Sequence, residues 1–236
     1  MASSSPARLR AFIRRSTRLR EVPDLPGVRL QLADDVMSMC QLAGAELGQA
    51  DPDLPYWAFA WAGGLAISQY LMKNPGEVEG RTVLDVASGS GLCAIVALRC
   101  GAESAHAFDI DPLAEAAVAL NARANGVRVA FGRGDVLESP PPPCDVILAG
   151  DVCYQETMSS RMLAWLRQAA EQGTRVLIGD PGRHYLPVDL ERLAAFRVRT
   201  SLELEDAEIK ESAVFTFPGV SIGAVPRGFR VTSSGE

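Results

Sequence analysis

The sequence predicts an α/β protein built on an open, Rossmann-like parallel sheet, and one stretch shows its basic unit. Residues 82–87 form a short apolar run rich in β-forming side chains, as expected for a strand buried on both faces. The run breaks at two closely spaced glycines, Gly89 and Gly91, and continues as a helix-length segment over 92–100. A second strand-like run, 104–108, follows it. Strand, glycine turn, helix and strand is the plan of a nucleotide-type cofactor site.

The residues around the glycine turn indicate which cofactor it binds. Gly89, Gly91 and Ala94 match the dinucleotide fingerprint G-x-G-x-x-A. Asp109 stands about where that fold places the acid that binds the ribose. Asp85, however, comes just before the turn, where its carboxylate would repel the negative charges of a pyrophosphate. S-adenosylmethionine carries a sulfonium and an ammonium instead, so the sequence favours this cofactor over NAD(H).

Acidic residues follow or end the predicted strands of the sheet. They are Asp85, Asp109, Asp135, Asp151 and Asp180. Because the carboxyl ends of parallel strands meet at one edge, we expect these carboxylates to surround one pocket that suits a cationic ligand. An aspartate at such a position can instead cap a helix or a turn, and this alternative stays open for one or two of them.

Composition narrows the class of protein. The 236 residues are 47% hydrophobic and 22% charged, as in an ordinary globular domain with a substantial core. No apolar run approaches the length that spans a bilayer, and the net charge of −6 argues against general nucleic-acid binding. Five cysteines without a C-x-x-C pair and two unclustered histidines predict reduced thiols and no metal site.

The first twenty residues differ from the rest because they carry six arginines and no acid. Such a start can be a mitochondrial presequence. The alternative, which we favour, is an amphipathic arm whose arginines help to hold an acidic protein partner. Its apolar side would consist of Leu9, Phe12, Ile13 and Leu19.

Between the arm and the glycine turn, the sequence predicts a turn at 23–27 and helices over 32–47 and 65–73. An aromatic cluster at 55–64 precedes the second helix and holds Trp57 and Trp61. Either these tryptophans anchor the segment on the core, or one of them lies over the cofactor, where an aromatic face attracts a cation.

The segments after Asp109 continue the alternation of helix and strand. Asp111 and Pro112 are the N-cap and first-turn proline of a helix that ends at 125–126. The other predicted elements are strands at 127–131, 145–150 and 174–179, a helix at 155–171, two late antiparallel strands near 196–204 and 212–217, and a loose tail from 219.

Four motifs make the chain resemble the seven-β-strand protein-lysine methyltransferases. They are DVASGSG (85–91), FDIDP (108–112), the D-x-x-Y tip (151–154) and PYWAFAWAGG (55–64). IGDPGR (178–183) narrows the resemblance to the electron transfer flavoprotein β-subunit lysine methyltransferases, over about 12–218. The resemblance implies a seven-stranded sheet ordered 3-2-1-4-5-7-6. It makes 55–218 a methyltransferase domain between an N-terminal arm and helical segment (1–54) and a C-terminal tail (219–236).

The resemblance also implies roles for single residues. Asp85, Gly89 and Gly91 would line the methionine part of S-adenosylmethionine, and Asp109 would hold the ribose hydroxyls. Asp135 would lie near the adenine, with Trp61 packed at its edge. Asp151 and Tyr154 would frame the acceptor lysine.

The implied substrate is the electron transfer flavoprotein β subunit, and lysine methylation of a ribosomal protein is the first alternative. A protein that uses the same fold to bind the cofactor or a partner without catalysis is a further alternative. We expect a monomer that binds neither nucleic acid nor membrane, in a bacterial cytoplasm or, alternatively, in the mitochondrial matrix.

Overall fold

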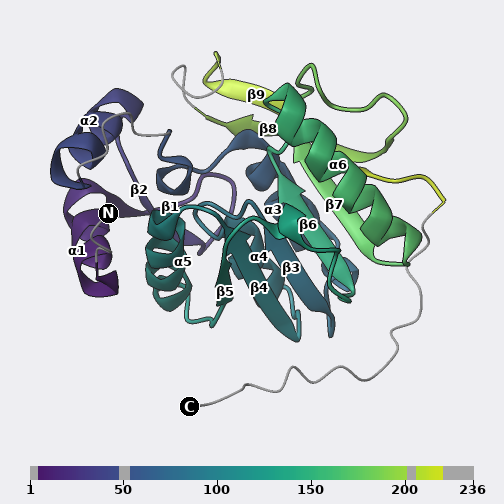
Figure 1. Cartoon of the computed structure of the whole chain (residues 1–236), viewed down its shortest axis with the longest axis horizontal. Helices are drawn as coiled ribbons and strands as arrows, with labels where there is room; N and C mark the ends of the chain where they lie inside the picture. The colour runs from purple at the N-terminus through teal and green to yellow at the C-terminus, as the bar shows by residue number, and fades with distance from the viewer. Residues whose placement is uncertain (1–4, 48–53, 201–205, 220–236) are drawn as a thin grey trace.

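A seven-stranded sheet forms the centre of the computed structural model, which describes residues 5–47, 54–200 and 206–219 (Figure 1). Its strands are β3 (Thr82–Val86), β4 (Ser104–Asp109), β5 (Ala130–Arg133), β6 (Val146–Gly150), β7 (Arg175–Asp180), β8 (Glu191–Arg199) and β9 (Ile209–Thr216). Across the sheet they follow as β5-β4-β3-β6-β7-β9-β8. Numbered from β3, this is the order 3-2-1-4-5-7-6, so the predicted fold class is confirmed.

The strand pairing places a switch point between β3 and β6. These two strands pair in parallel, with Val83 beside Val146 and Val86 beside Ala149. From β3 the chain moves outward to β4 and β5, and from β6 it moves in the opposite direction to β7. Ligands of open α/β sheets bind at such a reversal, beyond the carboxyl ends of the strands. β9 runs antiparallel to both β7 and β8 and completes the sheet.

Helices cover both faces of the sheet. On one face lie α3 (Ala62–Lys73), α4 (Leu92–Arg99) and α5 (Pro112–Ala124), and on the other lies α6 (Glu156–Glu171), as Figure 1 shows. Short 3-10 turns occur at η1 (Tyr56–Ala58), η2 (Pro75–Glu77) and η3 (Val136–Glu138). Alternate residues of a strand serve the two faces, so that Leu148 packs with α3 and α4 whereas Ile147 packs with α6.

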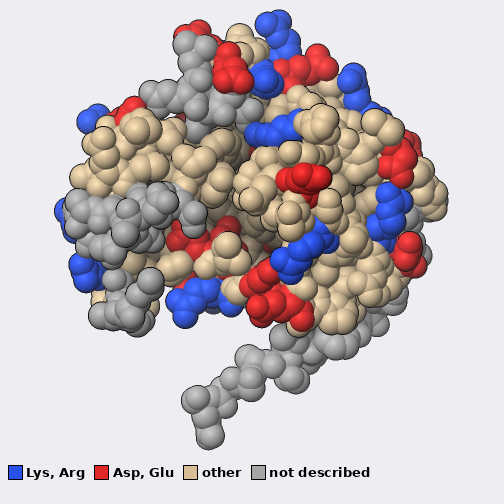
Figure 2. All heavy atoms as spheres, turned by 45° about the horizontal axis from the view of Figure 1, so that its top comes forward, with Lys and Arg blue, Asp and Glu red and all other residues tan. Residues whose placement is uncertain are grey.

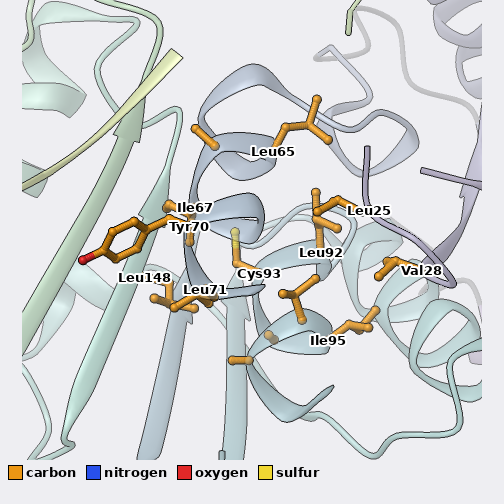
Figure 3. Packing of buried hydrophobic residues seen from close by; sticks show 14 of the residues in the cluster. Leu25, Val28, Leu65, Ile67, Tyr70, Leu71, Leu92, Cys93, Ile95 and Leu148 are labelled. Carbon is orange, nitrogen blue, oxygen red and sulfur yellow. The ribbon is translucent and has the colours of Figure 1, made fainter. Parts of the chain in front are cut away.

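The N-terminal segment forms α1 (Pro6–Ser16), a hairpin of β1 (Arg18–Glu21) and β2 (Arg29–Leu32), and α2 (Val36–Leu47). α1 and α2 lie together beside α5 in Figure 1. The hairpin turn joins the main core, because Leu25 and Val28 pack in the same cluster as Leu65 of α3 and Ile95 of α4 (Figure 3). The arm is therefore folded onto the domain, and whether its arginines contact a partner stays a prediction.

Two expectations for this segment are wrong. Leu9, Phe12 and Ile13 are buried on one side of α1 as predicted, but Leu19 is 43% exposed on β1 because the helix has already ended at Ser16. The helix expected from residue 32 begins only at Val36, since residues 29–32 pair with β1. The alternation of polar and apolar residues in this short hairpin carries too weak a strand signal to compete with the helical pattern that follows it.

Some strand boundaries also shift. β5 begins at Ala130 rather than at residue 127. The N–H of Val127 donates to the Ala122 carbonyl at the end of α5, so Val127 belongs to the helix C-terminus and not to the strand. β8 begins at Glu191, before the predicted start, and carries a bulge between Arg192 and Ala194. Residues 201–204 of that predicted strand and 220–236 of the predicted tail lie outside the described residues. Among the described helices, none combines the length and apolar character needed to cross a bilayer.

Candidate functional site

A cleft of about 1190 Å³ opens at the carboxyl edge of the sheet, over the switch point. Figure 2 is turned toward this edge and shows the hollow, with acidic side chains in it. The predicted site residues that line it are Asp85, Asp109, Asp135, Asp151, Gly89, Trp61 and Tyr154. The structure thus brings together side chains that the sequence spreads over almost a hundred positions.

Asp180, the remaining strand-end acid, does not line the cleft. It is 1% exposed, and its Oδ1 accepts the backbone N–H groups of Gly182 at 2.7 Å and Arg183 at 2.6 Å. The expectation that it would surround the pocket is wrong, because its carboxylate is used by its own turn. The capping alternative therefore holds for Asp180.

Asp85 contributes a buried carboxyl group from β3. Its Oδ2 accepts the N–H of Ala94 in the first turn of α4, at 3.0 Å. Burial raises the pKa of Asp85 to about 8, and the neighbouring Asp109 adds to the rise. Such a group gains from a ligand cation that stabilises its ionised form.

Asp109 holds the glycine turn. Its Oδ2 accepts the N–H of Gly89 at 2.8 Å, its Oδ1 accepts the N–H of Asp111 at 2.9 Å, and burial raises the pKa of this carboxyl. Gly91 is not among the residues that line the cleft. Its φ is +79°, and a Cβ there would lie 2.9 Å from a methyl carbon of Val118 on α5. Gly91 therefore shapes the turn and lets α5 pack against it.

Asp135 lies beyond the edge strand β5, which is three places across the sheet from β6, the strand that Asp151 follows. Its side chain accepts the N–H of Leu137 at 2.9 Å and so caps η3. Its other oxygen is 3.4 Å from Nη2 of Arg161 on α6. This aspartate combines the capping role with a position in the cleft wall.

Asp151 follows β6 in a left-handed backbone conformation, with φ of +60°. Its carboxylate accepts the N–H groups of Gly63 at 3.0 Å and Gly64 at 2.9 Å, and Nη1 of Arg183 lies 2.7 Å from its Oδ1. The first N–H groups of a helix lack partners within the helix, so Asp151 satisfies two such groups of α3.

Close backbone contact brings α3 to Asp151. A Cβ on Gly63 would lie 2.1 Å from the carbonyl oxygen of Gly179 on β7, which no side chain tolerates. A Cβ on Gly150 would likewise lie 2.9 Å from the nitrogen of Gly64. Glycines on both sides therefore allow the first turn of α3 to rest directly on the ends of β6 and β7.

Aromatic side chains form one wall of the cleft. The rings of Trp61 and Tyr56 are 5.5 Å apart, and the rings of Tyr56 and Tyr154 are also 5.5 Å apart. Trp61 donates its Nε1–H to the Tyr56 carbonyl at 3.0 Å. Trp57, by contrast, is buried edge-on against Phe12 of α1, which supports the anchoring alternative for this tryptophan.

Two buried polar atoms at the cleft lack a partner among the described residues. They are Nε1 of Trp57 and Oγ of Ser88, and both residues line the cleft. A buried polar group without a hydrogen bond costs ~1–3 kcal/mol, which a polar ligand could recover. Together with the buried carboxylates, these atoms fit an organic ligand that carries both cationic and polar groups, as S-adenosylmethionine does.

Several site residues were missed from the sequence. The N–H groups of Gly63 and Gly64 hold Asp151, and Arg183 pairs with it. The glycine pair carried a signal, because two glycines in the first turn of a helix indicate close backbone approach. Arg183 stood in a recognised motif, but nothing in the sequence indicated that it would reach another strand end.

Comparison with known proteins finds methyltransferases, both by family profile and by similarity over most of the sequence. The family profile described as ribosomal protein L11 methyltransferase (PrmA) matches residues 67–151. The electron transfer flavoprotein beta subunit lysine methyltransferase of Rattus norvegicus is 38% identical over 170 residues, which cover 69% of this chain and 67% of that protein. Its Xenopus laevis counterpart is 34% identical over 220 residues, covering 88% and 86%.

The fold has solved neighbours as well. A Pyrococcus horikoshii protein assigned as an RNA methyltransferase superposes with a TM-score of 0.54 at 15% identity, covering 71% of this chain and 89% of the other. At that identity the likeness concerns the fold alone. The extent and identity of the sequence matches decide the family: this chain belongs to the electron transfer flavoprotein beta subunit lysine methyltransferases.

Proposed function

We propose that the chain is an S-adenosylmethionine-dependent protein-lysine N-methyltransferase that acts on an electron transfer flavoprotein β subunit. The observation that carries the proposal is the row of carboxylates along one cleft at the switch point of the sheet, in a chain of this family. Such an edge repels a pyrophosphate and attracts a cationic cofactor and a cationic acceptor side chain.

At the cofactor end, residues of β3, β4 and β5 would hold S-adenosylmethionine. Asp85 and Gly89 would line its methionine part, Asp109 its ribose, and Asp135 its adenine, with Trp61 packed at its edge. When bound, the cofactor supplies a methyl group activated by a sulfonium. Trp57 Nε1 and Ser88 Oγ offer it two further donors that no described residue uses.

At the acceptor end, Asp151 and Tyr154 would position the lysine. A carboxylate has about four acceptor positions, and the N–H groups of Gly63 and Gly64 and the Arg183 guanidinium fill three of those of Asp151. The remaining position can orient the amine of a lysine whose aliphatic chain passes the Tyr56 and Tyr154 rings. Orientation of this kind lowers the free-energy barrier of a bimolecular reaction by up to ~7–11 kcal/mol.

Methylation of a ribosomal protein is the alternative substrate assignment, and one observation favours it. The L11 methyltransferase profile matches residues 67–151. That range ends at Asp151 and therefore omits Tyr154 and the turn that carries Arg183. It covers the cofactor end, which methyltransferases with different substrates can share, so it supports the chemistry more than the substrate.

Labelling of a cell extract tests the proposal. The protein is incubated with extract and S-adenosylmethionine labelled in its methyl group, and we expect the labelled protein to be the flavoprotein β subunit. Label on a ribosomal protein instead would reassign the substrate, and absence of label despite cofactor binding would favour a non-catalytic role. The control is Asp109→Ala, which should weaken cofactor binding by ~1.5–3 kcal/mol and reduce labelling.

A further inference from the structure

Arg183 brings a cation to the end of the cleft that must also admit the substrate lysine. Its Nη1 lies 2.7 Å from Oδ1 of Asp151 and 3.4 Å from Oδ2 of Asp180. The Arg183 side chain is 20% exposed, and those of Asp151 and Asp180 are 12% and 0% exposed. Because the ions are largely removed from solvent, their interaction is screened much less than that of a surface pair.

The turn after β7 fixes the direction of Arg183. Asp180 Oδ1 accepts the backbone N–H groups of both Gly182 and Arg183, and Gly182 adopts a φ of +88°. Pro181 restrains the backbone between them. The segment IGDPGR (178–183) therefore has a structural role: the buried Asp180 holds a tight turn that directs the arginine side chain to the end of β6.

The ion pair of Asp151 and Arg183 affects the charge of the substrate lysine. The amine of a free lysine has a pKa of about 10.4 and is protonated near neutral pH. Only the neutral amine has a lone pair that can accept a methyl group. A bare Asp151 carboxylate would stabilise the ammonium and so retain the proton. A fixed guanidinium beside the carboxylate offsets its charge and disfavours a second positive charge nearby.

We propose that Arg183 is a positioning residue that holds Asp151 and favours the uncharged form of the substrate amine at the acceptor end. This rests on the proposed lysine methylation. The other titratable groups that line the cleft are Tyr56, Asp85, Cys93, Asp109, Asp111, Asp135, Tyr154, Arg161, Asp206 and Lys210. Of these, Tyr154 follows the same strand end as Asp151, and Arg161 pairs with Asp135, which follows the edge strand β5.

The test is the pH dependence of single-turnover methyl transfer to a purified flavoprotein β subunit at saturating S-adenosylmethionine. In the native protein the rate rises with pH as the bound lysine loses its proton. Arg183→Gln should shift this rising limb of the profile to higher pH by about one unit. At pH values below the pKa of the bound lysine the rate should therefore fall about tenfold, and at high pH it should recover. Arg183→Lys keeps the charge and should leave the limb near its native position.

A matched control is Arg161→Gln, which removes the same charge from the same cleft but beside Asp135, and it should not move the limb. Melting temperature and cofactor affinity are measured for every variant. If Arg183→Gln lowers the rate equally at all pH values, Arg183 is merely structural and the inference fails. If the native protein does not methylate lysine in any β subunit, the proposed function itself fails, and the two results are distinguishable.

Discussion

Among single residues, Asp85 shows how the cleft prepares for a cationic ligand. Its carboxyl is 2% exposed and has a pKa of about 8, raised mainly by burial. In the unfolded chain the same group ionises near pH 3.8. Over the interval between these values the folded protein holds a proton that the unfolded chain has released.

This difference sets the sign of a pH effect on stability. The folded state binds more protons than the unfolded state, so the free energy of unfolding of the ligand-free protein should fall as pH rises from about 4 to about 8. The slope contributed by Asp85 is at most ~1.4 kcal/mol per pH unit. Denaturant unfolding of native protein and Asp85→Asn at several pH values measures it.

The Asn variant should lose stability less steeply with pH. Part of the slope should remain, because burial also raises the pKa values of Asp109 and Asp180. Added S-adenosylmethionine should flatten the native profile, since a ligand cation lowers the pKa of the carboxyl it approaches. Parallel profiles for the native and Asn proteins would show that Asp85 does not hold the proton.

At the scale of secondary-structure elements, the contact of α3 with the sheet depends on missing side chains. A Cβ on Gly179 of β7 would lie 2.1 Å from the carbonyl oxygen of Gly63. Gly179→Ala should therefore push α3 away from Asp151 and lower stability by ~1–3 kcal/mol or more, as other overpacked sites do. Thermal unfolding measures the loss.

Gly76 provides the control for this substitution. A Cβ there would meet no atom within 4 Å, and its φ is not in the left-handed region. Gly76→Ala should change stability by no more than ~0.5 kcal/mol. Similar melting temperatures for the two alanine variants would mean that α3 does not rest on β7 as described.

α5 joins the N-terminal hairpin to the glycine turn through one side chain. The fully buried Asn121 accepts the N–H of Gln31 on β2 at 2.7 Å and donates to the Ser90 carbonyl at 2.8 Å. Asn121→Ala leaves both groups unpaired, and we expect it to cost ~1–3 kcal/mol of stability and to weaken S-adenosylmethionine binding. Calorimetric titration with the cofactor measures the second effect.

A variant of Asn125, one helical turn later, separates the effect on stability from the effect on cofactor binding. Asn125 bonds to the backbone N–H and carbonyl of Arg29 but not to the glycine turn. Asn125→Ala should therefore lower stability and leave cofactor affinity near the native value. Equal cofactor affinities for both variants would exclude a role of Asn121 in holding the turn.

At the scale of the whole molecule, the strands of the sheet could be predicted because buried parallel strands give continuous apolar runs and glycines mark the turns between them. Their order, by contrast, came from the resemblance to the lysine methyltransferases, and the structure confirms it. The strand-end rule predicted that five acids would surround one pocket; Asp85, Asp109, Asp135 and Asp151 do line it, whereas Asp180 does not. The sequence could not show how each carboxylate is used. That depends on contacts between segments far apart in the chain, such as Gly63 with Asp151 and Arg183 with Asp151.

The packing of the N-terminal segment could not be predicted for the same reason, because it depends on contacts with distant parts of the chain. Its arginines suggested an arm, whereas the structure buries one side of α1 against α5 and places the hairpin turn in the main core. Residues 6–32 thereby support the wall of the cleft through α5 and Trp57. A charge pattern indicates which side of a helix faces solvent, but the rest of the fold determines which segment packs against its apolar side.

The central claim is methyl transfer to lysine of an electron transfer flavoprotein β subunit, and mass spectrometry of that subunit tests it most directly. The purified subunit is incubated with the protein and S-adenosylmethionine, and its mass and modified residues are determined. We predict a mass gain of whole methyl groups that maps to lysine side chains and requires both the protein and the cofactor. An unmodified subunit in the presence of folded, cofactor-binding protein would contradict the account, as would methyl groups on residues other than lysine.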